Sequence, residues 1–460
     1  MNLCIHGHFY QPPREDPISN YIPAERGCEP FCNWNEKISA ECYEQNAEAG
    51  NFAKISFNVG PTLFSWMQAY RPDVAKQIVE QEIGNFEKFG VGNGMAQSYN
   101  HTILPLANYQ DKETQVRWGI DEFVFRFGHQ PAGMWLPEAA VDMETLCVLS
   151  DHGLKFVILA PWQVQALEAK PGPYYIQLPG GRPPFVVFPY RQDLSTMVSF
   201  IPQATENGDY FLSTVRNSLS NQRDNLNIVA SDGELYGHHQ KFRNHFLTYV
   251  LNRSGQETGI DWTYPGLWLL ENEVGSEAIL HEPSSWSCFH GVDRWSKECA
   301  CTPGADWKEP FMEVMRAIAS WLDQIYFEQL SKIVPDPWEL RHRYIQVVNG
   351  QLSIQELIAQ SANKVITDSE LNKINLLMKA QYERQRMFTS CGWFFEEFHR
   401  IEPQNNIAYA ANAVWLTQKA TGETIDPAII RKMTDVRSKK TGLRADTIFT
   451  QTLVRAENET

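Results

Sequence analysis

The stretch Ile228–Gln240 concentrates ionisable side chains and reads Ile-Val-Ala-Ser-Asp-Gly-Glu-Leu-Tyr-Gly-His-His-Gln. Its apolar beginning predicts the end of a buried strand, and Asp232, Glu234, His238 and His239 then follow within eight residues. Asn, Gly, Pro or a single Asp is enough for an ordinary turn, so this density of acids and imidazoles favours a loop that does chemistry. The alternative is a solvated polar loop in which Asp232 caps a helix.

A second carboxylate ends the run Gly133-Met-Trp-Leu-Pro-Glu138. An apolar run stiffened by proline desolvates Glu138 in part, and such a carboxylate can act as a nucleophile or a general acid. In the alternative interpretation, Glu138 begins a helix and interacts with its dipole. Glu138 and Asp232 together would supply the two carboxylates that cleavage of a glycosidic bond needs. A gap of roughly 5 to 5.5 Å between them gives retention of configuration, and one of about 6.5 to 9.5 Å gives inversion.

Imidazole and amide groups follow other apolar runs. His6, His8 and Gln11 come after the first run, and His101 comes after Tyr-Asn further along the chain. A single histidine is more often structural, but two on the same side of a strand end are typical of donors to substrate hydroxyls or of metal ligands.

Four soft metal-ligand side chains, Cys288, His290, Cys299 and Cys301, lie within fourteen residues. They could hold a structural zinc ion, although their spacing is not that of a common zinc module. Free cysteines are ordinarily small buried apolar residues, which is the alternative. On balance the sequence predicts neither a metal nor another cofactor.

Seven short apolar runs alternate with helical stretches over the first 240 residues, which indicates a parallel α/β architecture. The runs are Leu3–Ile5, Lys54–Val59, Gly94–Ser98, 133–136, Phe156–Leu159, Phe185–Pro189 and Asn227–Ala230, and the clearest helices are Phe64–Ile83, Asp111–Gly128 and Val141–Gly153. Candidate functional residues end almost every run, which favours a barrel over a doubly wound sheet. From Phe311 onward, apolar residues at helical spacing predict a helical region.

The amino-acid composition limits which classes of protein are possible. The 460 residues are 43% hydrophobic and carry a net charge of −15, which argues against a nucleic-acid or anionic-membrane partner. The first residues do not resemble a secretory signal, no apolar run is long enough to span a membrane, and nine cysteines are typical of a reducing compartment, so a cytoplasmic location is expected. The 14 Trp suit both sugar stacking and a large core, and Tyr236 and Trp286 are the aromatics expected against a sugar ring.

With these residues, the chain resembles glycoside hydrolase family 57, whose retaining members include α-amylases, 4-α-glucanotransferases and branching enzymes. Four blocks match in order, of which the last two are specific: His6–Pro12, Gly94–Pro105, Gly133–Glu138 and Ser231–Gly237. Ser284–Gly291 and Met387–Phe395 resemble a subgroup with an uncharacterised C-terminal domain. The residues after Glu138 depart from the family pattern and the fifth block is not identified, so the resemblance does not specify the substrate within the family.

The resemblance implies an incomplete (β/α)7 barrel over residues 1–300, with a mainly α-helical region, 301–460, packed on it. Glu138 would be the nucleophile, and Asp232 would be the general acid/base with a raised pKa. The expected substrate contacts are His6, His8, Gln11, His101, Trp135, Arg191, Asp193, Glu234, Tyr236, His238, Trp286 and His290.

The function expected is therefore hydrolysis or transfer on an α-1,4-linked glucan through a covalent glycosyl-enzyme, with an oligo- or polysaccharide as the partner. Two alternatives stay open: a metal-dependent polysaccharide deacetylase on a related barrel, and a non-catalytic carbohydrate-binding protein. The sequence does not indicate an oligomeric state.

Overall fold

A computed structural model describes residues 1–219, 225–253 and 255–459. The chain is mixed α/β, as the sequence predicts, and divides into two compact units. Unit 1 comprises residues 1–13, 24–99 and 123–287, and unit 2 comprises residues 14–23, 100–122 and 288–460. The domain boundary expected near residue 300 stays a prediction, because unit 2 takes in two segments from the first half of the chain.

Unit 1 holds the strands, and parallel neighbours follow one another in chain order. β1 (Asn2–Phe9) pairs with β9 (Leu226–Asp232) and with β2 (Ser56–Val59), while β3 (Ala96–Gln97) pairs with β4 (Met134–Trp135) and β5 (Phe156–Leu159) pairs with β8 (Phe185–Pro189). Parallel bridges Phe57↔Gly94 and Gly133↔Phe156 connect these pairs. The Arg191 N–H donates to the Ile228 carbonyl at 2.8 Å, which links the end of β8 to β9.

Short strands complete unit 1: β10 (Asp261–Trp262) pairs with the start of β1, β7 (Tyr174–Ile176) with β8, and β6 (Val164–Ala166) with β11 (Ala278–Leu280). The last two pairs are antiparallel. Two of these short strands, β6 and β7, lie between β5 and β8 in the sequence.

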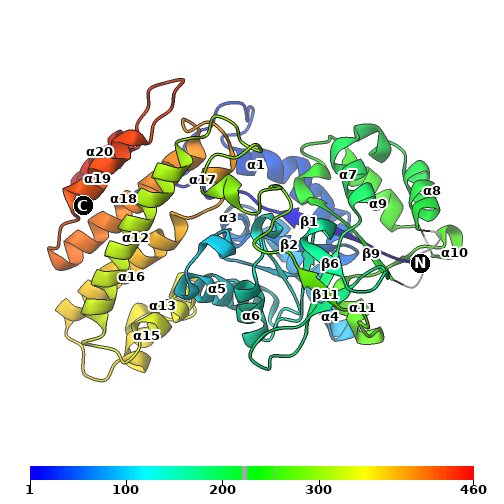
Figure 1. Cartoon of the computed structure of the whole chain (residues 1–460), viewed down its shortest axis with the longest axis horizontal. Helices are drawn as coiled ribbons and strands as arrows, with labels where there is room; N and C mark the ends of the chain where they lie inside the picture. Colours follow the sequence, from blue (N-terminus) through cyan, green and yellow to red (C-terminus); the bar gives the residue numbers. More distant parts are fainter. Residues whose placement is uncertain (220–224, 254, 460) are drawn as a thin grey trace. The chain divides into compact units, whose positions relative to one another are not determined.

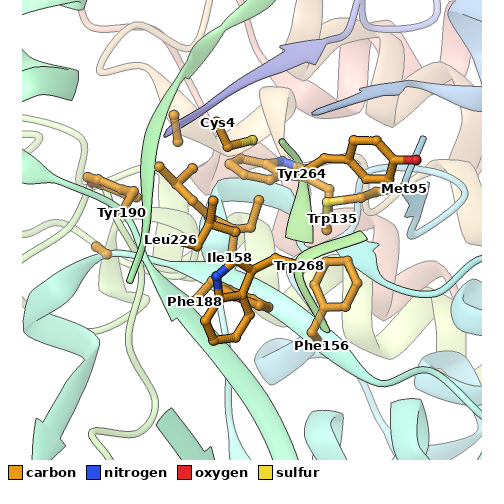
Figure 2. Packing of buried hydrophobic residues seen from close by; sticks show 13 residues of the cluster. Cys4, Met95, Trp135, Phe156, Ile158, Phe188, Tyr190, Leu226, Tyr264 and Trp268 are labelled. Carbon is orange, nitrogen blue, oxygen red and sulfur yellow. The ribbon is translucent and has the colours of Figure 1, made fainter. Parts of the chain in front are cut away.

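Alternate residues of the parallel strands bury a common apolar cluster. Phe156 and Ile158 of β5 and Leu226 and Ile228 of β9 lie two apart, so each pair points to one side of its strand. Figure 2 shows these side chains packed with Trp135, Phe188 and Trp268. Apart from Asn227, these strands begin as apolar runs in the sequence, because parallel strands are covered on both faces.

The helices of unit 1 lie between the strands in the sequence (Figure 1). They are α1 (Trp34–Ile38), α2 (Glu44–Glu48), α3 (Pro61–Tyr70), α4 (Pro72–Phe89), α6 (Met143–Asp151), α7 (Gln192–Phe200), α8 (Gly208–Ser218), α9 (Arg243–Leu251), α10 (Gly255–Thr258) and α11 (Pro265–Glu271). The single helix expected over Phe64–Ile83 is two helices, because Pro72 cannot donate a backbone hydrogen bond and disfavours helical backbone at Arg71.

Unit 2 is helical, as expected for the C-terminal part of the chain. The long helices α12 (Lys308–Leu330), α16 (Asp368–Arg386), α18 (Ile401–Thr421) and α20 (Ala445–Asn458) provide most of it (Figure 1). The shorter ones are α13 (Pro337–Arg343), α14 (Ile345–Val348), α15 (Ile354–Ser361), α17 (Cys391–Phe394) and α19 (Pro427–Lys432), and most of α5 (Tyr109–Phe127) also belongs here. Among the described residues, no helix is both long and apolar enough to cross a membrane.

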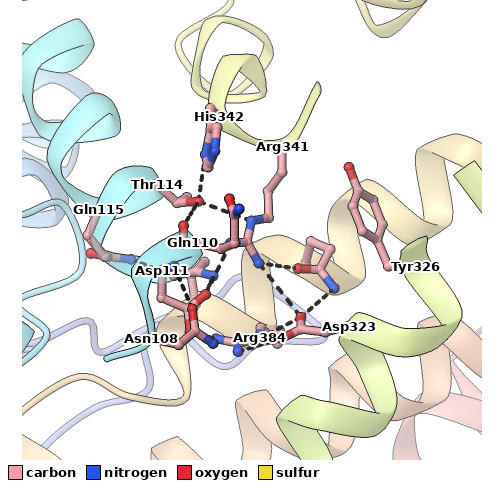
Figure 3. A network of polar contacts seen from close by, with 12 residues as sticks. Asn108, Gln110, Asp111, Thr114, Gln115, Asp323, Tyr326, Arg341, His342 and Arg384 are labelled. Carbon is pink, nitrogen blue, oxygen red and sulfur yellow. Dashed lines mark hydrogen bonds and ion pairs between the residues drawn. The ribbon is translucent and has the colours of Figure 1, made fainter. Parts of the chain in front are cut away.

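A buried network of charges ties the helices of unit 2 together (Figure 3). Asp111 lies 2.7 Å from Arg384 and 3.1 Å from Arg341, while Asp323 accepts from Arg384 at 2.7 Å. Although burial alone would raise the pKa of Asp111, the two guanidinium groups hold it below its ordinary value. A cavity of about 340 Å³ lies beside this network, lined mainly by the 102–111 segment and by α12 and α16.

Candidate active site

Glu138 lies just after β4, in backbone that residues other than glycine rarely adopt. Its φ and ψ are 59° and 21°, and Ala139 follows with a φ of 48°. Left-handed backbone costs about 1 kcal/mol or more in such residues, and it persists where the surroundings hold it. Glu138 Oε2 accepts hydrogen bonds from Trp286 Nε1 at 2.9 Å and Ser287 Oγ at 2.8 Å, and its carbonyl accepts from the Trp286 N–H at 3.0 Å. These contacts fix both the backbone and the carboxylate of Glu138.

Asp232 is the last residue of β9, opposite His8 of β1 in the strand register. Its side chain keeps contact with solvent, although the surrounding protein desolvates the carboxyl group. This desolvation and, second, the negative charge of Glu138 raise the pKa of Asp232 to about 7. The two carboxylates therefore lie close enough to interact, and near neutral pH Asp232 can both give and take a proton.

Gly233 lies between Asp232 and Glu234, and a side chain at this position would cause a steric clash. A Cβ on Gly233 would overlap the ring of Phe9, which packs directly against the backbone at this point. The close approach of β1 and the loop after β9 thus requires glycine here.

Glu234 is buried and faces protein groups. Its Oε1 accepts from the Tyr10 N–H at 3.0 Å and from the Tyr43 hydroxyl at 2.6 Å, at the end of the π-helical turn η1 (Ser39–Tyr43). Burial raises the pKa of Glu234 to about 8, with a further contribution from Asp232 and an opposing one from Tyr43. Gln11 is also buried and contacts Tyr43. This arrangement favours a positioning role for Glu234.

His6 and His8 are buried side by side on β1 and stack on Trp135, with ring centroids 4.7 and 5.1 Å away. His6 Nδ1 lies 2.9 Å from Ser56 Oγ, and His8 Nδ1 lies 3.2 Å from Asn58 Oδ1. Burial lowers the pKa of His6 to about 3, with a contribution from His8, and lowers that of His8 to about 4. Both imidazoles are therefore neutral at physiological pH.

Three aromatic rings pack edge to face beside Glu138. Trp135 and Trp286 have centroids 5.1 Å apart, and Tyr190 lies 6.3 Å from Trp286. Trp135 is fully buried, whereas Trp286 keeps exposed surface. The buried atoms Trp135 Nε1 and His6 Nε2 have no hydrogen-bond partner among the described residues, a situation that ordered water or a ligand usually relieves.

Arg191 and Asp193 bind each other just after β8. Arg191 Nε and a terminal nitrogen donate to the Asp193 carboxylate at 3.0 and 2.8 Å, and Ser218 Oγ donates to the same carboxylate at 2.7 Å. The pair therefore joins the start of α7 to the end of α8, and a substrate would compete with these contacts.

The rest of the loop after β9 is also held by protein groups. Tyr236 is buried, and its hydroxyl accepts from Ser231 Oγ at 3.3 Å. His238 Nδ1 lies 2.6 Å from a carboxylate oxygen of Glu41, and the exposed His239 lies beside it. Tyr236 is thus placed as a core residue, and His238 contacts the Glu41 carboxylate.

Two of the expected substrate contacts belong to unit 2. His101 is buried with a φ of 55°, and its Nδ1 lies 2.6 Å from Ser390 Oγ. His290 lies beside Cys288 and Cys301. The role of each histidine toward the substrate stays a prediction.

Several residues that position the site do not stand out in the sequence. Ser56 and Asn58 hold the two histidines of β1, and Ser287 holds Glu138. The signal for the first two is polar residues at alternate positions of an otherwise apolar run, since these face the same side of a strand. Tyr43 offers no comparable signal, because its contact with Glu234 spans 191 residues.

Both parts of the chain are similar in sequence to known protein families. Residues 6–267 match the model of glycosyl hydrolase family 57, and residues 305–458 match a domain of unknown function, DUF3536. An α-amylase from Pyrococcus horikoshii is 23% identical over 236 residues, which cover 48% of this chain and 34% of the relative. The match thus spans about a third of this curated relative.

Solved structures of related fold cover nearly the whole chain. An exo-type maltose-forming amylase from Pyrococcus sp. ST04 has a TM-score of 0.74 at 16% identity, covering 98% of this chain and 88% of its own. A 4-α-glucanotransferase from Thermococcus litoralis has a TM-score of 0.57 at 15% identity, covering 91% and 60% respectively. The family model spans more than half of the sequence and confirms the resemblance: the chain belongs to glycosyl hydrolase family 57.

Proposed function

We propose that this protein cleaves α-linked glucans with retention of configuration, passing the glycosyl group to water or to a sugar hydroxyl. The observation that carries the proposal is the electrostatic pairing of Asp232 with Glu138, in which burial and the Glu138 charge raise the pKa of Asp232 to about 7. The substrate class is supported by the names of relatives, an α-amylase among the sequences and an exo-type maltose-forming amylase among the structures.

In the first step, Glu138 attacks the anomeric carbon while Asp232 protonates the leaving oxygen. The hydrogen bonds from Trp286 and Ser287 hold the attacking carboxylate in one orientation, which reduces the entropy lost on reaching the transition state. Neutral His6 and His8 add no charge that would lower the pKa of Asp232.

In the second step, the same geometry changes the role of Asp232. Once Glu138 is bound in an ester, its negative charge is gone, and one of the two causes of the raised pKa of Asp232 disappears. The pKa of Asp232 then falls, so the carboxylate becomes the stable form and takes a proton from the incoming water or sugar hydroxyl. Hydrolysis and transfer differ only in this acceptor.

We also propose that unit 1 is a (β/α)7-type barrel whose strand ends carry this chemistry. The proposal is supported by the order of pairing, which runs from β9 through β1, β2, β3, β4, β5 and β8 and returns to β9 through the Arg191–Ile228 hydrogen bond. Glu138 and Asp232 both follow carboxyl ends of these strands, where barrel enzymes place their catalytic groups.

The test is to trap the glycosyl-enzyme with a fluorinated α-glucoside and to identify the labelled peptide. We expect the label on Glu138. With an α-glucosyl fluoride and azide, Glu138→Ala should give the β-glycosyl azide, and Asp232→Ala should give the α-glycosyl azide, because azide replaces the nucleophile in one and the acceptor in the other. Glu234→Gln serves as the control and should give neither product. A label on another residue, or the same anomer from both alanine variants, would overturn the assignment.

A further inference from the structure

We propose that Cys288, His290, Cys299 and Cys301 form a structural zinc site in unit 2. One ligand atom from each residue lies within 4.8 Å of all the others. Cys288 Sγ is 3.9 Å from Cys299 Sγ and 4.0 Å from His290 Nδ1, and Cys301 Sγ is 3.5 Å from the same nitrogen. No other group of three or more such residues within metal-binding reach occurs in the described part of the chain.

Two of these separations match the edges of one tetrahedron around a zinc ion, and the third, from Cys288 to His290, is about 0.4 Å longer. With Zn–S bonds of about 2.3 Å and Zn–N bonds of about 2.0 to 2.1 Å, tetrahedral angles place two sulfurs about 3.8 Å apart, and a sulfur and a nitrogen about 3.6 Å apart. The distances from Cys288 to Cys299 and from Cys301 to His290 lie within about 0.2 Å of these values. The cluster is thus the size of a site for a single ion.

Local backbone contacts hold the sulfurs in place. Backbone hydrogen bonds from His290 and Arg294 reach the Cys288 thiol, and others from Cys301 and Thr302 reach Cys299. The Thr302 N–H also donates to the Cys299 carbonyl at 2.8 Å, which closes a tight turn around the third ligand. Donors aimed at sulfur stabilise a thiolate, the form of cysteine that binds metal.

A buried cation offsets the charge of the proposed complex. Zinc bound to three thiolates and a neutral imidazole carries a net charge of −1. Lys308 is buried, interacts electrostatically with Cys299, Glu396 and Cys288 as well as with the cationic Arg294, and donates to the Arg294 carbonyl at 2.8 Å. The thiolates of the site add to the negative charge that Glu396 supplies near this buried ammonium group.

A structural ion fits better than a disulfide or a catalytic metal. The distance of 3.9 Å between the Cys288 and Cys299 sulfurs is about twice the length of a disulfide bond, so the two sulfurs are not bonded to each other. Four protein ligands fill a tetrahedral site and leave no open position for substrate. The segment has little regular structure apart from the turn Asp293–Trp295, so a metal would supply much of what holds it. Cys288 also directly follows Ser287, one of the two residues that hold Glu138.

The first test measures zinc in the full chain, purified under reducing conditions without chelator. We expect one zinc per chain, and at least a tenfold loss in Cys299→Ser and in Cys301→Ser. The exposed Cys32 belongs to unit 1, so Cys32→Ser is the matched control and should keep its zinc. Zinc retained in both cluster variants, or a native protein that cannot be loaded with zinc, would refute the site.

The second test uses the unmodified protein, so it does not depend on the variants folding. Cobalt exchanged into the site should give the absorption of a tetrahedral cobalt–thiolate complex, and a mercurial reagent should release zinc as the thiols are modified. A chelator should lower the thermal midpoint of the wild type, and added zinc should restore it. Octahedral cobalt absorption, or a Cys288–Cys299 disulfide in the reduced preparation, would overturn the proposal. These measurements do not involve glycoside cleavage, so their failure leaves the proposed function untouched.

Discussion

Replacing Glu138 with glutamine removes one negative charge beside Asp232 and should lower the pKa of Asp232. That pKa rises from an ordinary value of 3.8 to about 7, a change of about 3, of which burial is the larger cause and Glu138 the smaller. Glu138 therefore raises the pKa of Asp232 by less than about 1.5, and solvent around the accessible Asp232 side chain screens this interaction further. We expect the pKa of Asp232 to fall by about 1, to about 6.

The measurement is a titration followed by carbon-13 NMR, on protein labelled at the aspartate side-chain carboxyl carbon. Comparison with Asp232→Asn assigns the signal. Glu234→Gln is the matched control: the pKa of Glu234 lies at about 8, so this side chain is mostly neutral at pH 7, and glutamine can still accept from Tyr10 and Tyr43. We expect the control to leave the pKa of Asp232 near 7. An unchanged pKa in Glu138→Gln, or an equal fall in the control, would refute the coupling on which the proposed mechanism depends.

Trp286→Phe removes one hydrogen bond to the carboxylate of the proposed nucleophile and should lower kcat/KM roughly 10- to 150-fold. The control is Trp262→Phe, which removes an indole N–H that has no partner among the described residues and should leave kcat/KM unchanged. His6 has a pKa of about 3 when folded and about 6.5 when unfolded, so the free energy of unfolding should decrease as pH falls below 6.5, by up to about 1.4 kcal/mol per pH unit. Between pH 6.5 and 5, the free energy of unfolding of His6→Asn should fall by about 1.6 kcal/mol less than that of the wild type in urea denaturation. Equal losses would contradict the neutral buried imidazole. Asp111→Ala removes one carboxylate beside two buried guanidinium groups and should lower the free energy of unfolding by about 3 kcal/mol in chemical denaturation. Asp151→Ala, which breaks a surface ion pair, should lower it by less than about 1 kcal/mol.

The sequence alone was enough to predict a mixed α/β fold and to propose the two carboxylates. Strands and helices follow from the local spacing of apolar residues, which burial imposes on each segment separately. Glu138 and Asp232 could be predicted because each follows its own apolar run, and both positions lie within blocks that resemble the family. The same reasoning missed the break between α3 and α4, because apolar spacing continues across Pro72 although its backbone hydrogen bond cannot form.

Only the tertiary structure shows the different surroundings of the two neighbouring acids. Asp232 and Glu234 are two residues apart, but one keeps contact with solvent and interacts with Glu138, while the other is buried against Tyr10 and Tyr43. These partners come from other parts of the chain, and desolvation depends on everything packed around a group. Spacing along the sequence carries neither kind of information.

The two hydrogen bonds to Glu138 and the geometry of the cysteine cluster also arise only when the chain folds. Trp286 lies 148 residues from the carboxylate that it contacts, and Cys288 lies 11 residues from Cys299. In the sequence, Cys288, His290, Cys299 and Cys301 match no common zinc module, whereas in the folded chain their ligand atoms lie within 4.8 Å of one another. Residue types and their order determined which groups could act, and only folding decided which of them meet, because distance and burial are properties of the packed chain.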